Sequence, residues 1–187
     1  YEEGKGLLGN IDFTQLEFKK IAHTILKVDK VNLFAEGDKV ELNSYVNIGN
    51  GGWAGSSQVI VDNVFSSERH VSVSHSTDNG GDVAVEGIID SLYTFTGKAN
   101  VSGAWFIPGT TTEIKRTDLQ IDVSAKLKEG IKGITAEITS DSTFYQPPKM
   151  SRLVPFRVRG HLENGIAEIT EFSTRNNEGE TINVTAA

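Results

Sequence analysis

The residues best suited to chemistry lie in one short stretch, Arg69–Ser76, which reads R-H-V-S-V-S-H-S. On a β-strand, His70, Ser72 and Ser74 share one face and His75 lies on the other, because side chains alternate. A hydrolase also needs an acid that orients the histidine, and a serine nucleophile often stands in a Gly-x-Ser-x-Gly turn, which is missing around these residues. We therefore interpret the stretch as a strand with a solvated polar face and predict no catalytic residue.

Metal and cofactor sites are not expected either. The segment D-N-G-G-D at 78–82 is similar to the start of a calcium loop, but it lacks the ligand spacing and the distal glutamate, so we predict a plain turn. His23 and His161 stand alone, and the chain has no cysteine. No glycine-rich loop has the spacing that binds phosphate ahead of a helix. The sequence thus predicts a protein that is not an enzyme.

Composition limits the partners and the architecture. The formal net charge of −7 makes nucleic acid an unexpected partner, because an acidic chain does not attract a polyanion. No stretch approaches the roughly 18 apolar residues of a membrane-spanning helix. The 187 residues suffice for one β-domain covering 1–187. Because the chain starts at Tyr1, with neither an initiator methionine nor a signal peptide, we interpret it as an excised piece of a longer protein, with a processed protein as the alternative.

Alternation of apolar and polar residues is the dominant pattern, and it indicates strands with one apolar face. Turn sequences rich in Gly, Asn and Asp separate the alternating runs. The pattern predicts an all-β chain of about ten antiparallel strands. The expected strands cover 30–36, 40–48, 53–61, 69–76, 83–90, 93–107, 119–125, 134–138, 154–162, 166–172 and 181–186.

The apolar face is unusually rich in small residues, among them Gly87, Gly97, Ala99 and Gly160. Glycine within a strand marks a bend, a bulge or the close approach of another group. A sheet with so many glycines can curve strongly, so we expect a strongly curved open sheet, a β-groove. The alternative is a closed β-sandwich, in which two such faces pack on each other.

One segment departs from the alternation. Phe18, Ile21, Ala22 and Ile25 have helical spacing, and Thr14 with Glu17 could form a capping box ahead of them. This predicts a short helix near residues 15–26. The alternative is a strand over 11–18 that ends in a turn.

Three stretches resemble the β-rich repeats of TamB and its AsmA-like relatives. They are VNLFAEGDKVELNSYVNIGNGGWAGSSQVIV at 31–61, YTFTGKANVSGAWFIPGTTTEIKRTDLQIDVSAKL at 93–127 and VPFRVRGHLENGIAEITEFSTRNNEGETINVTA at 154–186. The apolar, proline-containing C-terminal tail expected at the end of a TamB-like protein is missing here, so the resemblance implies an internal segment. It also implies an open β-groove in the periplasm of a bacterium with two membranes, anchored to the inner membrane through other parts of the protein.

The function implied by this resemblance is bridge-like lipid transfer or assistance to outer-membrane assembly. The implied partners are lipid acyl chains, neighbouring β-segments of the same protein and an outer-membrane barrel protein. We expect these residues to line the groove: Trp53, Val59, Val61, Tyr93, Phe95, Val101, Trp105, Ile107, Leu119, Ile121, Val123, Ile134, Ile138, Val154, Phe156 and Val158. The alternatives are a carbohydrate-binding β-sandwich module and a structural domain of an adhesin or fibre.

Overall fold

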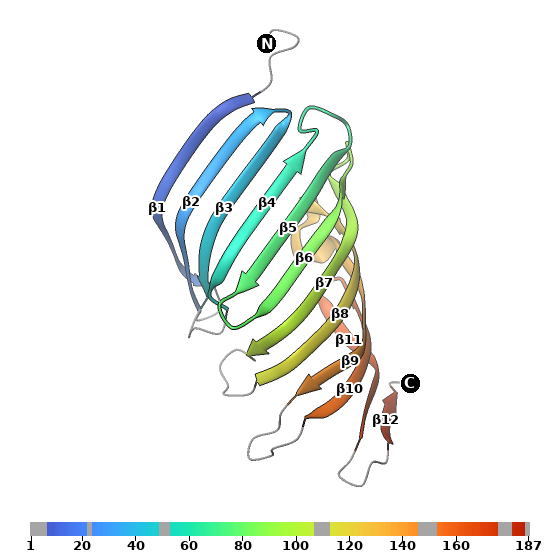
Figure 1. Cartoon of the computed structure of the whole chain (residues 1–187). Helices are drawn as coiled ribbons and strands as arrows, with labels where there is room; N and C mark the ends of the chain where they lie inside the picture. The colour runs from blue at the N-terminus through green and yellow to red at the C-terminus, as the bar shows by residue number, and fades with distance from the viewer. Residues whose placement is uncertain are drawn as a thin grey trace.

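The computed structural model describes residues 7–21, 24–48, 53–106, 113–145, 153–175 and 181–185. These residues form a single sheet of 12 antiparallel strands in which each strand pairs with its neighbours in sequence (Figure 1). The strands are β1 (Leu7–Ile21), β2 (Thr24–Gly37), β3 (Lys39–Ile48), β4 (Gly55–Asp62), β5 (Arg69–Thr77), β6 (Gly81–Ile89), β7 (Thr94–Phe106), β8 (Glu113–Lys126), β9 (Ile134–Tyr145), β10 (Val154–Glu163), β11 (Ile166–Arg175) and β12 (Thr181–Thr185). A short 3₁₀ segment, η1 (Leu127–Gly133), joins β8 to β9 and is kinked at Gly130.

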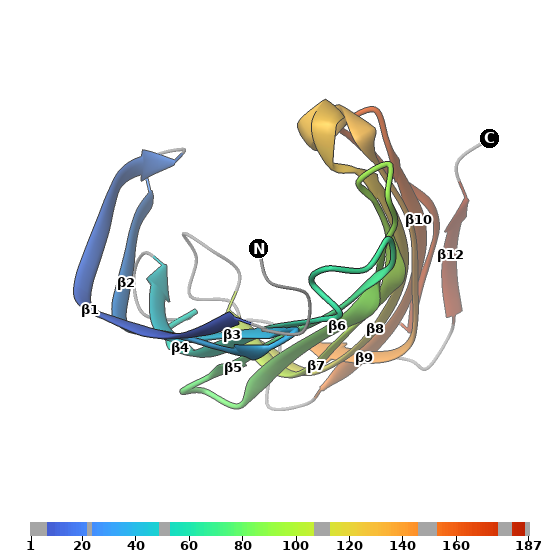
Figure 2. The same cartoon turned by 90° about the horizontal axis from the view of Figure 1, so that it is seen from above.

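The sheet is curved into an open trough, which Figure 2 shows from above. The predicted all-β, curved open sheet is therefore confirmed. The alternative of a closed β-sandwich is wrong, because the described strands make one unclosed sheet with no second sheet packed on it. Meander connectivity explains this result, since each hairpin adds its strand to the same growing edge.

The helix predicted near residues 15–26 is wrong, because β1 covers 7–21 and β2 begins at Thr24. Phe18 pairs with Leu26 and Ile21 with Thr24, and the register of the two strands shifts between these pairs. This break in the alternation, at the end of the β1–β2 hairpin, produces the three-residue spacing of Phe18 and Ile21 that suggested a helix. The alternative of a strand over 11–18 is confirmed, except that the strand continues to Ile21 instead of ending in a turn after Phe18.

Few side chains are buried in this architecture. The buried hydrophobic residues among those described are Val31, Ala54, Ala99, Trp105 and Ala136, and most of them are small. The rest of the apolar residues on the central strands are half-buried. Backbone pairing along the meander and contacts between neighbouring side chains therefore stabilise the sheet, without a second layer over the described strands.

Candidate functional site

The concave side of the sheet carries a continuous apolar surface, here called the trough face. Strand pairing aligns one residue per strand into a single row from β1 to β11. The row is Ile11, Leu33, Leu42, Val59, Val73, Val85, Ala99, Ile121, Ile138, Gly160 and Ile169. Because the register is regular across the central strands, the period-two pattern of each strand becomes one surface.

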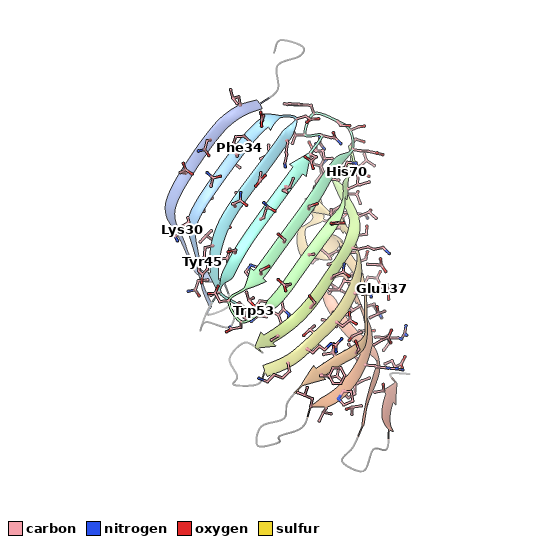
Figure 3. The ribbon with its side chains drawn as sticks, in the orientation of Figure 1. Lys30, Phe34, Tyr45, Trp53, His70 and Glu137 are labelled. Carbon is pink, nitrogen blue, oxygen red and sulfur yellow. The ribbon has the colours of Figure 1, made fainter. Side chains whose placement is uncertain are left out.

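The opposite, convex side, here called the outer face, is mostly polar, although Phe34 and Ile88 are also exposed on it. In Figure 3 the viewer looks onto this side, where Tyr45, His70 and Glu137 are among the labelled side chains. In β5 and β6 the outer-face side chains are exposed and the trough-face side chains are half-buried, in strict alternation. Curvature accounts for part of this difference, since side chains crowd together on a concave surface and spread apart on a convex one.

Most of the predicted groove-lining residues come together on the trough face. Pairing through β4, β7, β8, β9 and β10 places there Val59, Val61, Phe95, Val101, Leu119, Ile121, Val123, Ile134, Ile138, Val154, Phe156 and Val158. Ile107 lies outside the described residues. Trp53 precedes β4, and its ring packs against Trp105 at one end of the trough.

The two tryptophans form a packed pair at one end of the trough face. Their ring centroids are 4.8 Å apart, and the Trp105 Nε1 donates a hydrogen bond of 2.6 Å to the Ser102 carbonyl oxygen. A Cβ at Gly81 would come within 2.6 Å of the Trp105 ring, so only glycine lets the indole lie against β6. Trp105 is 4% exposed and thus offers no open platform on which a sugar ring could stack.

Glycines also make room for the ring of Phe95. Its ring lies over Gly87 of β6 and Gly97 of its own strand, since a Cβ at either position would come within 2.6 Å of ring atoms. The aromatic ring therefore lies flat along the sheet and does not project across the trough. Small residues thus keep the trough open where an aromatic residue occurs in it.

A polar pair also lies on the trough face, and the sequence did not reveal it. Ser57 of β4 and His75 of β5 are cross-strand partners, with 2.7 Å between the serine Oγ and the histidine Nδ1. The His75 Nε2 is buried without a hydrogen-bond partner among the described residues. Within that part of the chain no carboxylate contacts either residue, so the orienting acid of a hydrolase triad is missing. Only strand register could have revealed this pair.

The outer face is held by polar and charged cross-strand contacts. Lys98 pairs with Asp122 at 3.5 Å, and Arg159 with Glu171 at 3.4 Å. Glu41 accepts a hydrogen bond from the Asn43 amide, which is the main reason why its pKa is lowered, and the Gln58 amide and Lys39 add to the effect while partial burial opposes it. These contacts are typical of a solvated sheet surface.

Metal ligation finds no support in the described residues, where no cluster of three potential ligands occurs. In the predicted turn at 78–82, the Asp78 carboxylate accepts a hydrogen bond from the Tyr45 hydroxyl and the Asp82 carboxylate one from Ser76. Both carboxylates are therefore engaged with the protein.

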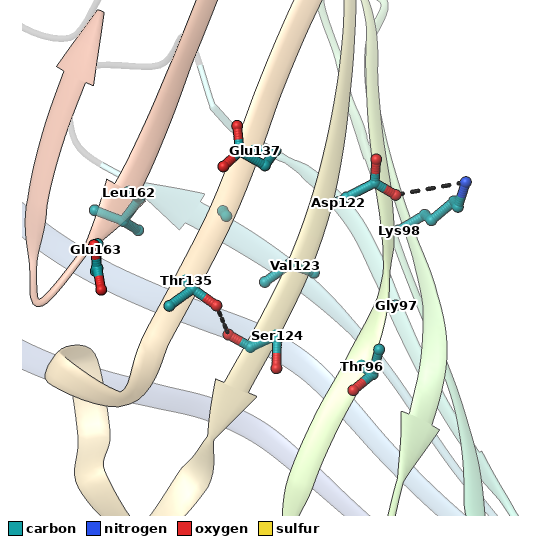
Figure 4. Close-up of a pocket in the computed structure, with 11 residues that line it drawn as sticks. Thr96, Gly97, Lys98, Asp122, Val123, Ser124, Thr135, Glu137, Leu162 and Glu163 are labelled. Atoms are coloured by element: carbon teal, nitrogen blue, oxygen red, sulfur yellow. Dashed lines mark hydrogen bonds and ion pairs between the residues drawn. The ribbon is translucent and has the colours of Figure 1, made fainter.

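A shallow depression of about 490 Å³ spans β7 to β10 (Figure 4). Gly97, Val123, Ala136 and Leu162 contribute one cross-strand row to its lining. Lys98, Asp122 and Glu137 alternate with that row along β7, β8 and β9, so they border the depression through their backbone while their side chains are exposed on the outer face. The depression is open, so the larger apolar feature of the molecule is the trough as a whole.

Tyr93 departs from its predicted position in the groove. It stands in the turn before β7, has a positive φ of 63° and is 47% exposed. Its left-handed backbone interrupts the alternation that was extrapolated from Phe95. Tyr93 thus belongs to the rim of the trough and not to its apolar surface.

Comparison of the chain with family models, curated protein sequences and solved structures gives no significant match. Among the described residues, no helix is both long and apolar enough to cross a membrane. The trough is therefore the feature of the molecule that points to a function.

Proposed function

We propose that this chain is a non-catalytic segment of a lipid conduit in which the trough face holds acyl chains. One observation carries the proposal: a continuous apolar row crosses the sheet from β1 to β11, and no second layer covers it in the described structure. Large apolar surfaces left open on a protein mark binding sites.

The physics of acyl-chain transfer fits such a surface. Burial from water stabilises a chain by about 0.8 kcal/mol for each CH₂ group. With a spacing of about 4.8 Å between strands, 12 strands give a trough roughly 53 Å long. A lipid can then lie with its tails on the apolar surface while its polar head stays in water at the open side.

The resemblance to TamB and AsmA-like proteins agrees with this geometry. Under the proposal, the chain is an internal part of a longer periplasmic protein and assists phospholipid movement or outer-membrane assembly. Its neighbours would be further β-segments of the same protein and an outer-membrane barrel protein. The carbohydrate-binding and fibre alternatives lack a comparable supporting feature in the described residues.

The experiment places one charge on each face of the same strand. Ile121→Arg puts a guanidinium on the trough face of β8, and the adjacent Gln120→Arg puts one on the exposed outer face. Binding of a fluorescent fatty acid is measured by titration, and folding by circular dichroism. We expect Ile121→Arg to bind about tenfold more weakly, because acyl contact would leave the charge desolvated, whereas Gln120→Arg binds as the wild type does.

Folding of the variants separates an open trough from a covered core. Arginine on an open surface extends its head group into water, so Ile121→Arg and the parallel variant Val101→Arg should both stay folded. In a covered core, an unpaired charge would unfold the protein. Unfolded variants, or a folded wild type that binds no fatty acid, would refute the conduit.

A further inference from the structure

One rim of the trough combines exposed apolar side chains with cations. Turns 63–68, 90–93 and 127–133 link alternate strand pairs, so they stand at the same end of the sheet. Figure 2 shows η1, the third of them, at the top of one arm of the trough. Large side chains exposed along this rim are Phe65, Leu92, Tyr93 and Leu127, with Leu92 75% exposed.

Tyr93 is held in place by its backbone. The Asp90 Oδ1 accepts hydrogen bonds from the backbone N–H groups of Leu92 and Thr94, and the Tyr93 carbonyl accepts one of 3.0 Å from Leu127. A left-handed conformation costs a tyrosine on the order of 1 kcal/mol. These hydrogen bonds offset that cost and present the ring at the rim.

Two cations approach this ring from different elements. The Arg69 Cζ lies 5.8 Å from the ring centroid and the Lys128 Nζ lies 4.6 Å from it. Arg69 belongs to the trough face, since it pairs with Ile89, which in turn pairs with Phe95. The rim cluster, defined as Arg69, Tyr93 and Lys128, therefore adjoins the apolar surface directly.

The nearby groups leave these cations available. The Arg69 Nε donates to the Val64 carbonyl oxygen, which orients the guanidinium, and its two terminal nitrogens have no hydrogen-bond partner within the part of the chain that the structure describes. Neither Arg69 nor Lys128 has a carboxylate partner among the described residues, because Glu129 pairs with Lys126 and the Asp90 Oδ1 binds backbone N–H groups.

We propose that the rim cluster binds the phosphate of a phospholipid whose acyl chains lie on the trough face. This inference rests on the proposed function and adds the site that holds the phospholipid head group. Guanidinium and ammonium groups are the usual partners of phosphate oxygens, with arginine able to donate two parallel hydrogen bonds. The exposed Leu92 and Leu127 lie beside the cluster, where a phospholipid changes from polar head to apolar tail.

The test compares two soluble lipids that differ only in the head group. Dihexanoylphosphatidylglycerol, kept below its critical micelle concentration, and dihexanoylglycerol compete with a fluorescent fatty acid for the wild type, for Arg69→Gln/Lys128→Gln and for Lys98→Gln. Lys98 is a matched control because it is exposed on the outer face. Circular dichroism confirms that each variant is folded.

We expect the wild type to bind the phospholipid about tenfold more tightly than the neutral lipid, since hydrogen bonds to charged groups are worth this much. The double variant should lose this preference and keep its affinity for the neutral lipid, whereas Lys98→Gln should keep both. High salt should weaken phospholipid binding to the wild type only to the level of the neutral lipid.

Three results would overturn the inference. The double variant could retain the head-group preference. Inorganic phosphate alone could displace the phospholipid at similar concentration, which would assign the cluster to a free anion. The mutations could weaken binding to phosphatidylglycerol vesicles but not to the monomeric lipid, which would make the rim a membrane-docking surface. If the neutral lipid fails to bind at all, the trough proposal itself is wrong.

Discussion

The aromatic residues at the two ends of the central strands differ in burial. At one end, Trp105 lies against Gly81 beside Trp53 and is almost completely buried. At the other end, Tyr93 is half-exposed and is approached by cations. Both aromatic residues belong to the same alternating run of the sequence. Only Trp105 has a glycine, Gly81 on the neighbouring strand β6, that makes room for its ring.

This contrast suggests a division of labour along the trough. The tryptophan end is packed as a core is, so its residues should determine stability. The tyrosine end is open and charged, so its residues should determine binding. Substitutions at the two ends separate these roles.

The largest effect is expected at the tryptophan end. Trp105→Ala should lower the free energy of unfolding by about 3–5 kcal/mol, because it removes a buried ring and leaves a cavity. Tyr93→Ala should cost less than about 1 kcal/mol, since the ring is half-exposed. Urea denaturation of both variants measures the difference. Equal losses at the two ends would end the proposed division.

The second largest effect is expected when the space that Gly81 leaves for the Trp105 ring is filled. A Cβ at Gly81 would meet the Ala104 carbonyl oxygen at 2.5 Å and the Trp105 ring at 2.6 Å, so Gly81→Ala should destabilise the protein by about 1–3 kcal/mol. Gly9 of β1 is the matched control, because a Cβ there has nothing within 4 Å. Thermal unfolding should show a lower Tm for Gly81→Ala only. A Tm that matches the Gly9→Ala control would mean that the indole does not need the glycine.

A smaller effect should come from the backbone at the tyrosine end. Glycine adopts a positive φ without strain, so Tyr93→Gly should be more stable than Tyr93→Ala by about 1 kcal/mol. Both variants lack the ring, so the comparison isolates the backbone term. If Tyr93→Ala were the more stable of the two in urea denaturation, the left-handed turn would not be the native conformation.

The smallest effect is expected on the outer face, which belongs to neither end. The Asn43 amide lowers the pKa of Glu41, so the ionised form is favoured in the folded state. That stability is present above the pKa of the unfolded chain and is lost as the pH falls through the lower folded pKa. Glu41→Gln should therefore show a slightly shallower loss of Tm than the wild type below about pH 5. Parallel Tm profiles in acid would contradict this.

Much of the fold could be predicted because each strand carries its own alternation. Val59, Val101 and Ile121 come from different strands, yet their positions in three period-two patterns placed them on one face. The predicted helix near 15–26 and the predicted groove position of Tyr93 were wrong because the alternation of apolar and polar residues is interrupted there. The register of β1 and β2 shifts between Phe18 and Ile21, and Tyr93 has a positive φ, and local irregularities of this kind leave no periodic trace in the sequence.

The functional surface was only half predictable from the same patterns. Cross-strand pairs such as Ser57 with His75 depend on register, which links residues distant in sequence. The rim cluster depends further on how three turns gather at one end of the sheet. No short window of sequence contains such information.

By itself, the sequence determined the secondary structure of most strands, the apolar character of one face and the polar character of the other, because alternation is a local property. Only the tertiary structure decided whether that apolar face is covered. An open trough and a closed sandwich need the same alternation, since the pattern records which side chains avoid water and not what replaces the water. The order of pairing, with every described strand added beside its predecessor, leaves the face open.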